Sequence, residues 1–143
     1  MTRALLDVNV LIALFDQDHV DHERARAWFT AEIGAGWASC PITENGFVRV
    51  VSQPGYPSPI AVNEAIRRLD NATSTAHHEF WSCDLSLLDE RLVERRQLLG
   101  HRQVTDVYLL ATAVANGGRL VTFDRGVPLP AGHGATAEHL LVL

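Results

Sequence analysis

Four acidic residues hold positions that suit metal chemistry, because each follows a predicted strand or opens a predicted helix. Carboxylate oxygens are the ligands that magnesium and manganese prefer in proteins. If the four side chains converge, the sequence predicts a divalent metal site. These residues are Asp7, Glu44, Asp106 and Asp124.

A converging set of carboxylates has an electrostatic cost that a single one does not have. An acid at a helix start is common, since it can cap the helix and interact with the positive end of the helix dipole. Two unit charges about 4 Å apart, however, repel by roughly 4 kcal/mol at an effective dielectric constant near 20. Each acid alone is explained as a cap, whereas the four together call for a cation or a proton.

The elements that must position these acids follow from the apolar pattern, which alternates between strand-like and helix-like periods without an internal repeat. This alternation predicts an α/β fold of three layers, in which helices flank a mostly parallel central sheet of four to five strands. Strands are expected at residues 3–6, 37–40, 79–83, 119–123 and 139–143. Helices are expected at residues 9–15, 19–33, 41–51, 60–72, 85–99 and 105–116.

The carboxyl ends of the predicted strands are where a ligand site is expected in such a sheet. Asp7 and Asp124 come directly after the first and fourth predicted strands. Glu44 lies just past the second strand, and Asp106 lies in the first turn of a helix. The four carboxylates are therefore expected to meet at one edge of the sheet.

Size and charge limit the classes of function. The 143 residues match one ordinary domain, and we expect a single domain over residues 1–143. The net charge of −5 argues against a protein that coats nucleic acid by bulk electrostatics, which needs a basic face. An enzyme acting on nucleic acid is still compatible, because bound divalent ions reverse the local charge of an acidic site.

Other features favour a plain cytoplasmic protein. No apolar run approaches the roughly 20 residues that cross a bilayer, and no signal peptide is recognisable, so we expect no membrane association. Cys40 and Cys83 form no paired motif and are expected to be small buried residues. The closely spaced histidine pairs, such as His77 and His78, lack a third partner at metal-site spacing.

Four ordered motifs resemble those of PIN-domain proteins, specifically the VapC toxins of bacterial toxin–antitoxin modules. Each motif is weak alone, but together they span nearly the whole chain and arrive in the family's order. The motifs are LLDVNVLI at residues 5–12, TENG at 43–46, VTDVYLLA at 104–111 and LVTFDR at 120–125.

The resemblance implies a metal-dependent endoribonuclease with a PIN-like fold. Asp7 and Asp106 would be primary ligands of Mg²⁺ or Mn²⁺, with Glu44 and Asp124 completing the acidic cluster directly or through water. Water activated by the metal would attack phosphorus and leave a 5′-phosphate and a 3′-hydroxyl.

The resemblance also implies supporting residues and partners. Asn9 and Thr122 would orient the ligands, although helix capping and strand propensity explain them equally well. Arg102, Gln103 and Arg125 are best placed to bind RNA phosphates, and each arginine can equally be a solvated charge. The implied partners are RNA, a cognate VapB-like antitoxin and a second copy of the chain in a homodimer.

Three alternative classes of protein fit the sequence less well. A phosphoaspartate enzyme or receiver with Asp7 as nucleophile relies on a lysine, and this chain has none. A structure-specific DNA nuclease of the related type is usually longer and carries additional acids. A PIN scaffold that only binds RNA usually lacks some of the acids, whereas all four are present here.

Overall fold

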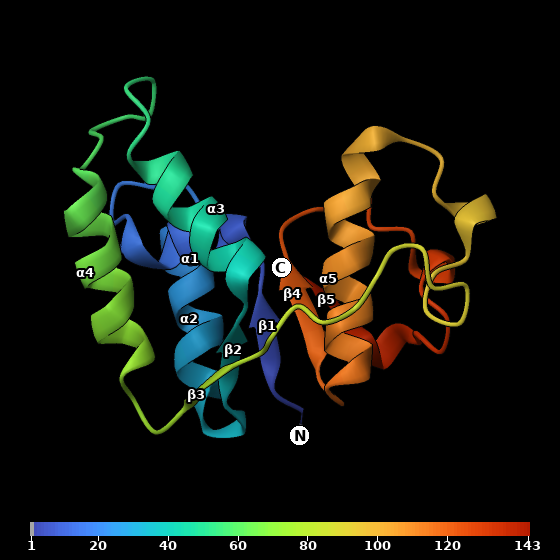
Figure 1. The fold of residues 1–143 in the computed structure, drawn as a ribbon. Coiled ribbons are helices and arrows are strands. Elements are labelled where there is room, and N and C mark those ends of the chain that lie inside the picture. Colours follow the sequence, from blue (N-terminus) through green and yellow to red (C-terminus); the bar gives the residue numbers. More distant parts are fainter. Residues whose placement is uncertain (1) are drawn as a thin grey trace.

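The computed structural model describes residues 2–143, which form a five-stranded parallel β-sheet covered by helices on both faces (Figure 1). The strand order is β3-β2-β1-β4-β5, and all four pairings are parallel. This confirms the predicted fold class. The strands are β1 (Ala4–Leu6), β2 (Trp37–Ser39), β3 (His78–Phe80), β4 (Arg119–Thr122) and β5 (Leu140–Val142).

The helices divide between the two faces of the sheet. Helices α1 to α4 lie on one side, and α5 packs on the other (Figure 1). The α-helices are α1 (Val8–Phe15), α2 (His22–Glu32), α3 (Pro41–Val51), α4 (Val62–Thr73) and α5 (Val104–Ala115). Single turns of 3₁₀ helix occur at Ile33–Ala35, Arg95–Gln97, His101–Gln103, Leu129–Ala131 and Ala137–His139.

Alternation along the strands builds a separate core on each face, because successive side chains point to opposite sides. Leu6 and Val121 pack with α1 to α4, whereas Leu5 and Leu120 pack with α5. All four are fully buried. Burying one such side chain stabilises the fold by about 1.5–3 kcal/mol, so the short central strands are held mainly by their packing.

The predicted helix at residues 85–99 is wrong. The segment forms short turns instead, among them one in which the carbonyl of Asp89 accepts hydrogen bonds from the amides of Leu92 and Val93. Beyond this turn, the amide of Glu94 donates to the carbonyl of Ala131 at 2.9 Å. The helix-like pattern of apolar residues in this segment reflects burial rather than a helix. Val93 packs in a small core with Val107 and Ala131, and a non-helical backbone can bury it equally well.

Two smaller differences concern element boundaries. Helix α2 begins at His22 rather than near residue 19, because the amides of Asp18 and His19 both bond to Asp16 in a turn. Strand β3 spans His78–Phe80 rather than residues 79–83, in register with β2. Within residues 2–143, no helix is long and apolar enough to cross a membrane.

Candidate metal centre

Asp7 lies at the junction of β1 and α1, where the chain turns from strand into helix. Its backbone amide donates to the carbonyl of Val121 at 3.0 Å, which joins it to β4. Its Oδ1 accepts a hydrogen bond from the amide of Val8 at 2.7 Å and so caps α1. Asp7 is only 7% exposed, and burial raises the pKa of its carboxyl group. The Asp7 side chain therefore caps α1 while its carboxyl group is buried at the end of β1.

Thr122, at the end of β4, connects the candidate site residues to one another. Its hydroxyl donates to Oδ2 of Asp7 at 2.7 Å and accepts from the amide of Asp124 at 3.0 Å. Asn9 also donates to this hydroxyl at 3.3 Å, and its Oδ1 accepts from the amide of Phe123 at 3.3 Å. Both side chains thus hold β4 and the start of α1 in a fixed relation around Asp7.

Asp106 and Asp124 complete a cluster of three carboxyl groups with Asp7. Burial, a hydrogen bond with Asp124 and the negative charges of Asp7 and Asp124 raise the pKa of Asp106 to about 7. Asp124 is exposed, and its Oδ1 accepts from the amide of Gly126 at 2.7 Å. The three aspartates come from the ends of β1 and β4 and from the first turn of α5, as the sequence predicted.

The chemistry of these donors fits a divalent cation. Asp7 contributes a buried carboxyl group, and a cation would offset the negative charges that raise the pKa of Asp106. Within residues 2–143, no group of three or more His, Cys, Asp or Glu side chains is arranged so that it could hold a metal ion as it stands. The fit therefore rests on an oxygen-only donor set whose carboxylates repel one another when all three are ionised.

Glu44 does not join the three aspartates. Its Oε2 accepts a hydrogen bond from the hydroxyl of Ser39 at 2.6 Å, and Ser39 also bonds to Nε2 of His78 at 2.7 Å. Ser39 shares a face of β2 with Trp37, which packs with α1 to α4, whereas Thr122 shares the face of Leu120 beside α5. The Ser39 hydroxyl that bonds Glu44 therefore lies on the opposite face of the sheet from the Thr122 hydroxyl that bonds Asp7.

The residues predicted to contact RNA lie close in sequence to the cluster but differ in their surroundings. Arg102 and Arg125 are exposed, and no hydrogen bond or ion pair of either guanidinium occurs among residues 2–143. Gln103 is partly buried, and its side-chain oxygen accepts from the amide of Leu99 at 3.1 Å. The arginines are therefore available for an anion, whereas Gln103 already stabilises the turn before α5.

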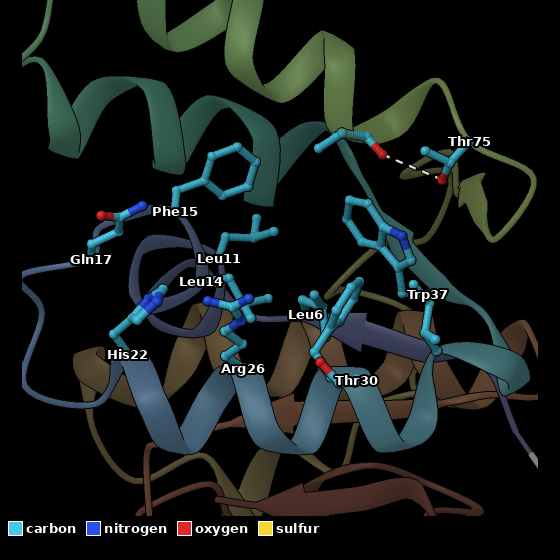
Figure 2. Close-up of a pocket in the computed structure, with 13 residues that line it drawn as sticks. Leu6, Leu11, Leu14, Phe15, Gln17, His22, Arg26, Thr30, Trp37 and Thr75 are labelled. Atoms are coloured by element: carbon cyan, nitrogen blue, oxygen red, sulfur yellow. Dashed lines mark hydrogen bonds between the residues drawn. The ribbon is translucent and has the colours of Figure 1, made fainter.

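A largely apolar cavity of about 470 Å³ lies on the side of the sheet away from the cluster. Figure 2 shows Leu11 and Phe15 of α1, His22 and Arg26 of α2 and Trp37 of β2 around it. No aspartate or glutamate lines this cavity. It is separate from the candidate metal centre.

Sequence reasoning missed Ser39 and His78, which now accompany Glu44. The two residues are 39 positions apart, and they meet only because β2 and β3 are neighbours in the sheet. In the sequence, His78 stands out only as half of a histidine pair that lacks a third metal ligand. No spacing in the sequence indicates such a contact before the strand order is known.

Comparison with known proteins identifies the family of this chain, which has a parallel α/β sheet and three clustered aspartates. The family model of the PIN domain matches residues 4–131. Ribonuclease VapC44 of Mycobacterium tuberculosis is 63% identical over 141 residues, which cover 99% of each chain. Ribonuclease VapC38 of the same organism is 48% identical over 125 residues, covering 87% of this chain and 86% of the relative.

A third relative, Ribonuclease VapC39 of M. tuberculosis, is 47% identical over 122 residues, covering 85% of this chain and 88% of the relative. These matches span nearly all of the described fold, including β1, α5 and β4, which supply the three aspartates. The chain belongs to the VapC family of PIN-domain proteins.

Proposed function

We propose that this protein is a divalent-metal-dependent endoribonuclease and the toxin of a VapBC-type toxin–antitoxin system, restrained by a cognate VapB-like antitoxin. The convergence of Asp7, Asp106 and Asp124 carries the proposal, because it concentrates negative charge that a cation would neutralise. The ribonuclease names of relatives up to 63% identical support RNA as the substrate. The cytoplasmic location, the single domain and the homodimer remain predictions.

Asp7, Asp106 and Asp124 would hold Mg²⁺ or Mn²⁺. When bound there, the ion supplies charge stabilisation for phosphodiester hydrolysis and lowers the pKa of a water molecule. Thr122 and Asn9 fix the orientation of Asp7 and the start of the loop that carries Asp124. Glu44, whose carboxylate accepts a hydrogen bond from Ser39, would complete the acidic cluster through water.

Arg102 and Arg125 would bind RNA phosphates beside the aspartates. Both guanidinium groups are exposed, and their planar forks match phosphate oxygens in a bidentate geometry. Such contacts orient the RNA but read no sequence. Gln103 is the weaker candidate, since its side-chain oxygen is already hydrogen bonded.

The direct test is cleavage of total cellular RNA by the antitoxin-free protein. We expect cleavage with Mg²⁺ or Mn²⁺, loss of cleavage in chelator, and loss in Asp7→Asn and Asp106→Asn. Products should carry 5′-phosphates, and addition of the cognate antitoxin should stop the reaction. Equal cleavage in chelator would contradict the metal mechanism, and cleavage of DNA but not RNA would contradict the substrate.

A further inference from the structure

A short basic segment, residues 95–105, leads into α5 and carries its first residues. It contains three arginines and a histidine but no aspartate or glutamate, in a chain whose formal net charge is −5. The segment lies along α5 on the side away from α1 to α4 (Figure 1). It ends in the first turn of α5, the turn that also carries Asp106. Positive charge is thus concentrated next to the aspartate cluster.

Three of the four basic side chains in this segment are exposed and free of protein partners. Among residues 2–143, the side chains of Arg96, His101 and Arg102 form no hydrogen bond and no ion pair. An unpaired guanidinium keeps its full set of donors for an incoming anion. These three residues therefore differ from the paired arginines elsewhere on the surface, such as Arg67, which is bonded to Glu64.

The two acids that precede the segment already have partners of their own. Glu90 pairs with Arg95 at 3.4 Å, which accounts for the fourth basic side chain. Glu94 lies 3.8 Å from His133, and its Oε1 accepts from the backbone amide of Arg96 at 3.2 Å. Neither carboxylate forms an ion pair with the Arg96 guanidinium. The charge of Arg96 is therefore left for a ligand.

The backbone of the segment is held in place, so its side chains are presented from a fixed surface. The amide of Glu94, just before it, donates to the carbonyl of Ala131 at 2.9 Å. Leu98 packs against the small core that contains Val93 and Ala131. The side chain of Gln103 accepts from the amide of Leu99 at 3.1 Å and closes the turn before α5. Little ordering of the backbone is then needed when a ligand binds, which favours affinity.

The spacing of these side chains suits an extended polyanion. Six residues separate Arg96 from Arg102, so their Cα atoms lie within about 20 Å even along a fully extended chain. Arg102 precedes Asp106 by four residues, which is about one helical turn. Leu99, between the two arginines, is 83% exposed and adds an apolar surface. Single-stranded RNA offers both phosphates and uncovered bases to such a surface.

We propose that Arg96, His101 and Arg102 bind the backbone of single-stranded RNA along the nucleotides that flank the cleaved bond, with Leu99 contacting a base. This inference rests on the proposed function and deepens it, because it adds Arg96, His101 and Leu99 to the RNA contacts at the metal centre. Arg102 holds the phosphate nearer the aspartates, and Arg96 holds one further along the strand. Both contacts position the RNA and take no part in the chemical step.

The salt dependence of RNA binding tests the phosphate contacts. A labelled oligouridylate of about 12 nucleotides is titrated in chelator, and each phosphate contact should contribute about 0.7 to the slope of log K against log salt concentration. Arg96→Gln and Arg102→Gln should each reduce the slope by about this amount. Their midpoints of thermal unfolding should equal that of wild type, because neither side chain has a protein partner to lose.

Arg91→Gln is the matched control, because Arg91 is equally exposed but its guanidinium is bonded to Asp89 at 2.9 Å. It should leave the slope unchanged. An equal loss of slope in Arg91→Gln would overturn the proposal, since binding would then depend only on bulk charge. A wild-type slope in both Arg96→Gln and Arg102→Gln would overturn it as well, as would competition by polyglutamate as strong as that by unlabelled oligouridylate.

Leu99→Ala tests the apolar contact separately. It should weaken oligouridylate binding several-fold at every salt concentration and leave the slope unchanged, because no charge is removed. Unchanged affinity would overturn the role of Leu99.

Cleavage separates this inference from the proposed function. Arg96→Gln should slow RNA cleavage at low RNA concentration and match wild type at saturating RNA. Metal-dependent cleavage with the wild-type KM in Arg96→Gln would overturn the inference and leave the proposed function intact. Absence of RNA cleavage by the wild-type protein, with the expected losses of slope, would overturn the proposed function and leave the binding site intact.

Discussion

The buried hydroxyl of Thr122 connects two of the three aspartates, since it donates to Asp7 and accepts from the amide of Asp124. Thr122→Val keeps the shape of the side chain and leaves both groups without this partner. We expect the free energy of unfolding to fall by about 1–3 kcal/mol, the cost of unpaired buried polar groups. Metal affinity should fall about 10- to 100-fold, because the orientation of Asp7 is lost.

Chemical denaturation and a manganese titration measure these two effects. Thr30→Val is the matched control, because Thr30 is exposed on α2 and its hydroxyl makes no hydrogen bond among residues 2–143. A Thr122→Val protein with wild-type metal affinity would show that Asp7 needs no orientation by the hydroxyl.

The pKa of Asp106, raised from 3.8 to about 7, makes the stability of the metal-free protein depend on pH. Between these values the folded protein binds a proton that the unfolded chain has released, so stability falls as pH rises from about 4 to about 7. Asp106→Asn removes this proton, so the loss of stability between pH 5 and pH 8 should be smaller in the variant. Urea denaturation in chelator at both pH values measures the difference.

The same proton competes with a cation. Metal affinity of the wild-type protein should therefore increase as pH rises toward 7 and level off above it. A wild-type protein whose metal-free stability increases from pH 5 to pH 8 relative to Asp106→Asn would contradict the shift.

At the scale of single residues, the positions of Asp7, Asp106 and Asp124 could be predicted, because strand ends and a helix start locate them on one edge of a parallel sheet. The direction in which the Glu44 side chain points could not be predicted. A side chain in the first turn of a helix points to a face that depends on how the helix packs, and here Ser39 and His78 determine it.

At the scale of elements, the turn between α5 and β4 is packed too closely for a side chain at Gly118. A Cβ atom there would lie 2.5 Å from the carbonyl oxygen of Arg3 and 2.5 Å from the ring of Trp81. Gly118→Ala should therefore lower the free energy of unfolding by about 1–3 kcal/mol through overpacking.

Gly100→Ala is the control for this variant, because a Cβ atom at Gly100 meets nothing within 4 Å. Thermal unfolding of the two variants gives the comparison. Equal stability of both would show that the β1 and β4 ends can separate at little cost.

The elements that the sequence predicted correctly are those whose apolar pattern has one structural explanation. Helix α3 begins at Pro41 and ends at Val51 as predicted, since proline is favoured at a helix start and the turn residues after 51 stop it. The segment at 85–99 has a helix-like pattern but pairs with residues 131–133 through backbone hydrogen bonds. A distant partner of this kind leaves no mark on local spacing.

At the scale of the whole molecule, the strand order β3-β2-β1-β4-β5 brings together residues that are more than a hundred positions apart. The sequence predicted a parallel sheet, yet the order of its strands follows from tertiary packing. Because β1 lies between β2 and β4, Asp7 meets Thr122 of β4 on the α5 side of the sheet. The same order places Ser39 beside His78 on the opposite side.

The central claim is that Asp7, Asp106 and Asp124 form one divalent metal centre, and a calorimetric Mn²⁺ titration of the metal-free protein tests it most directly. The control is Asp84→Asn, which removes an exposed acid outside the cluster. We predict that wild type and Asp84→Asn bind Mn²⁺ equally, and that Asp106→Asn weakens binding by at least about tenfold. Wild-type affinity in Asp106→Asn would contradict the account.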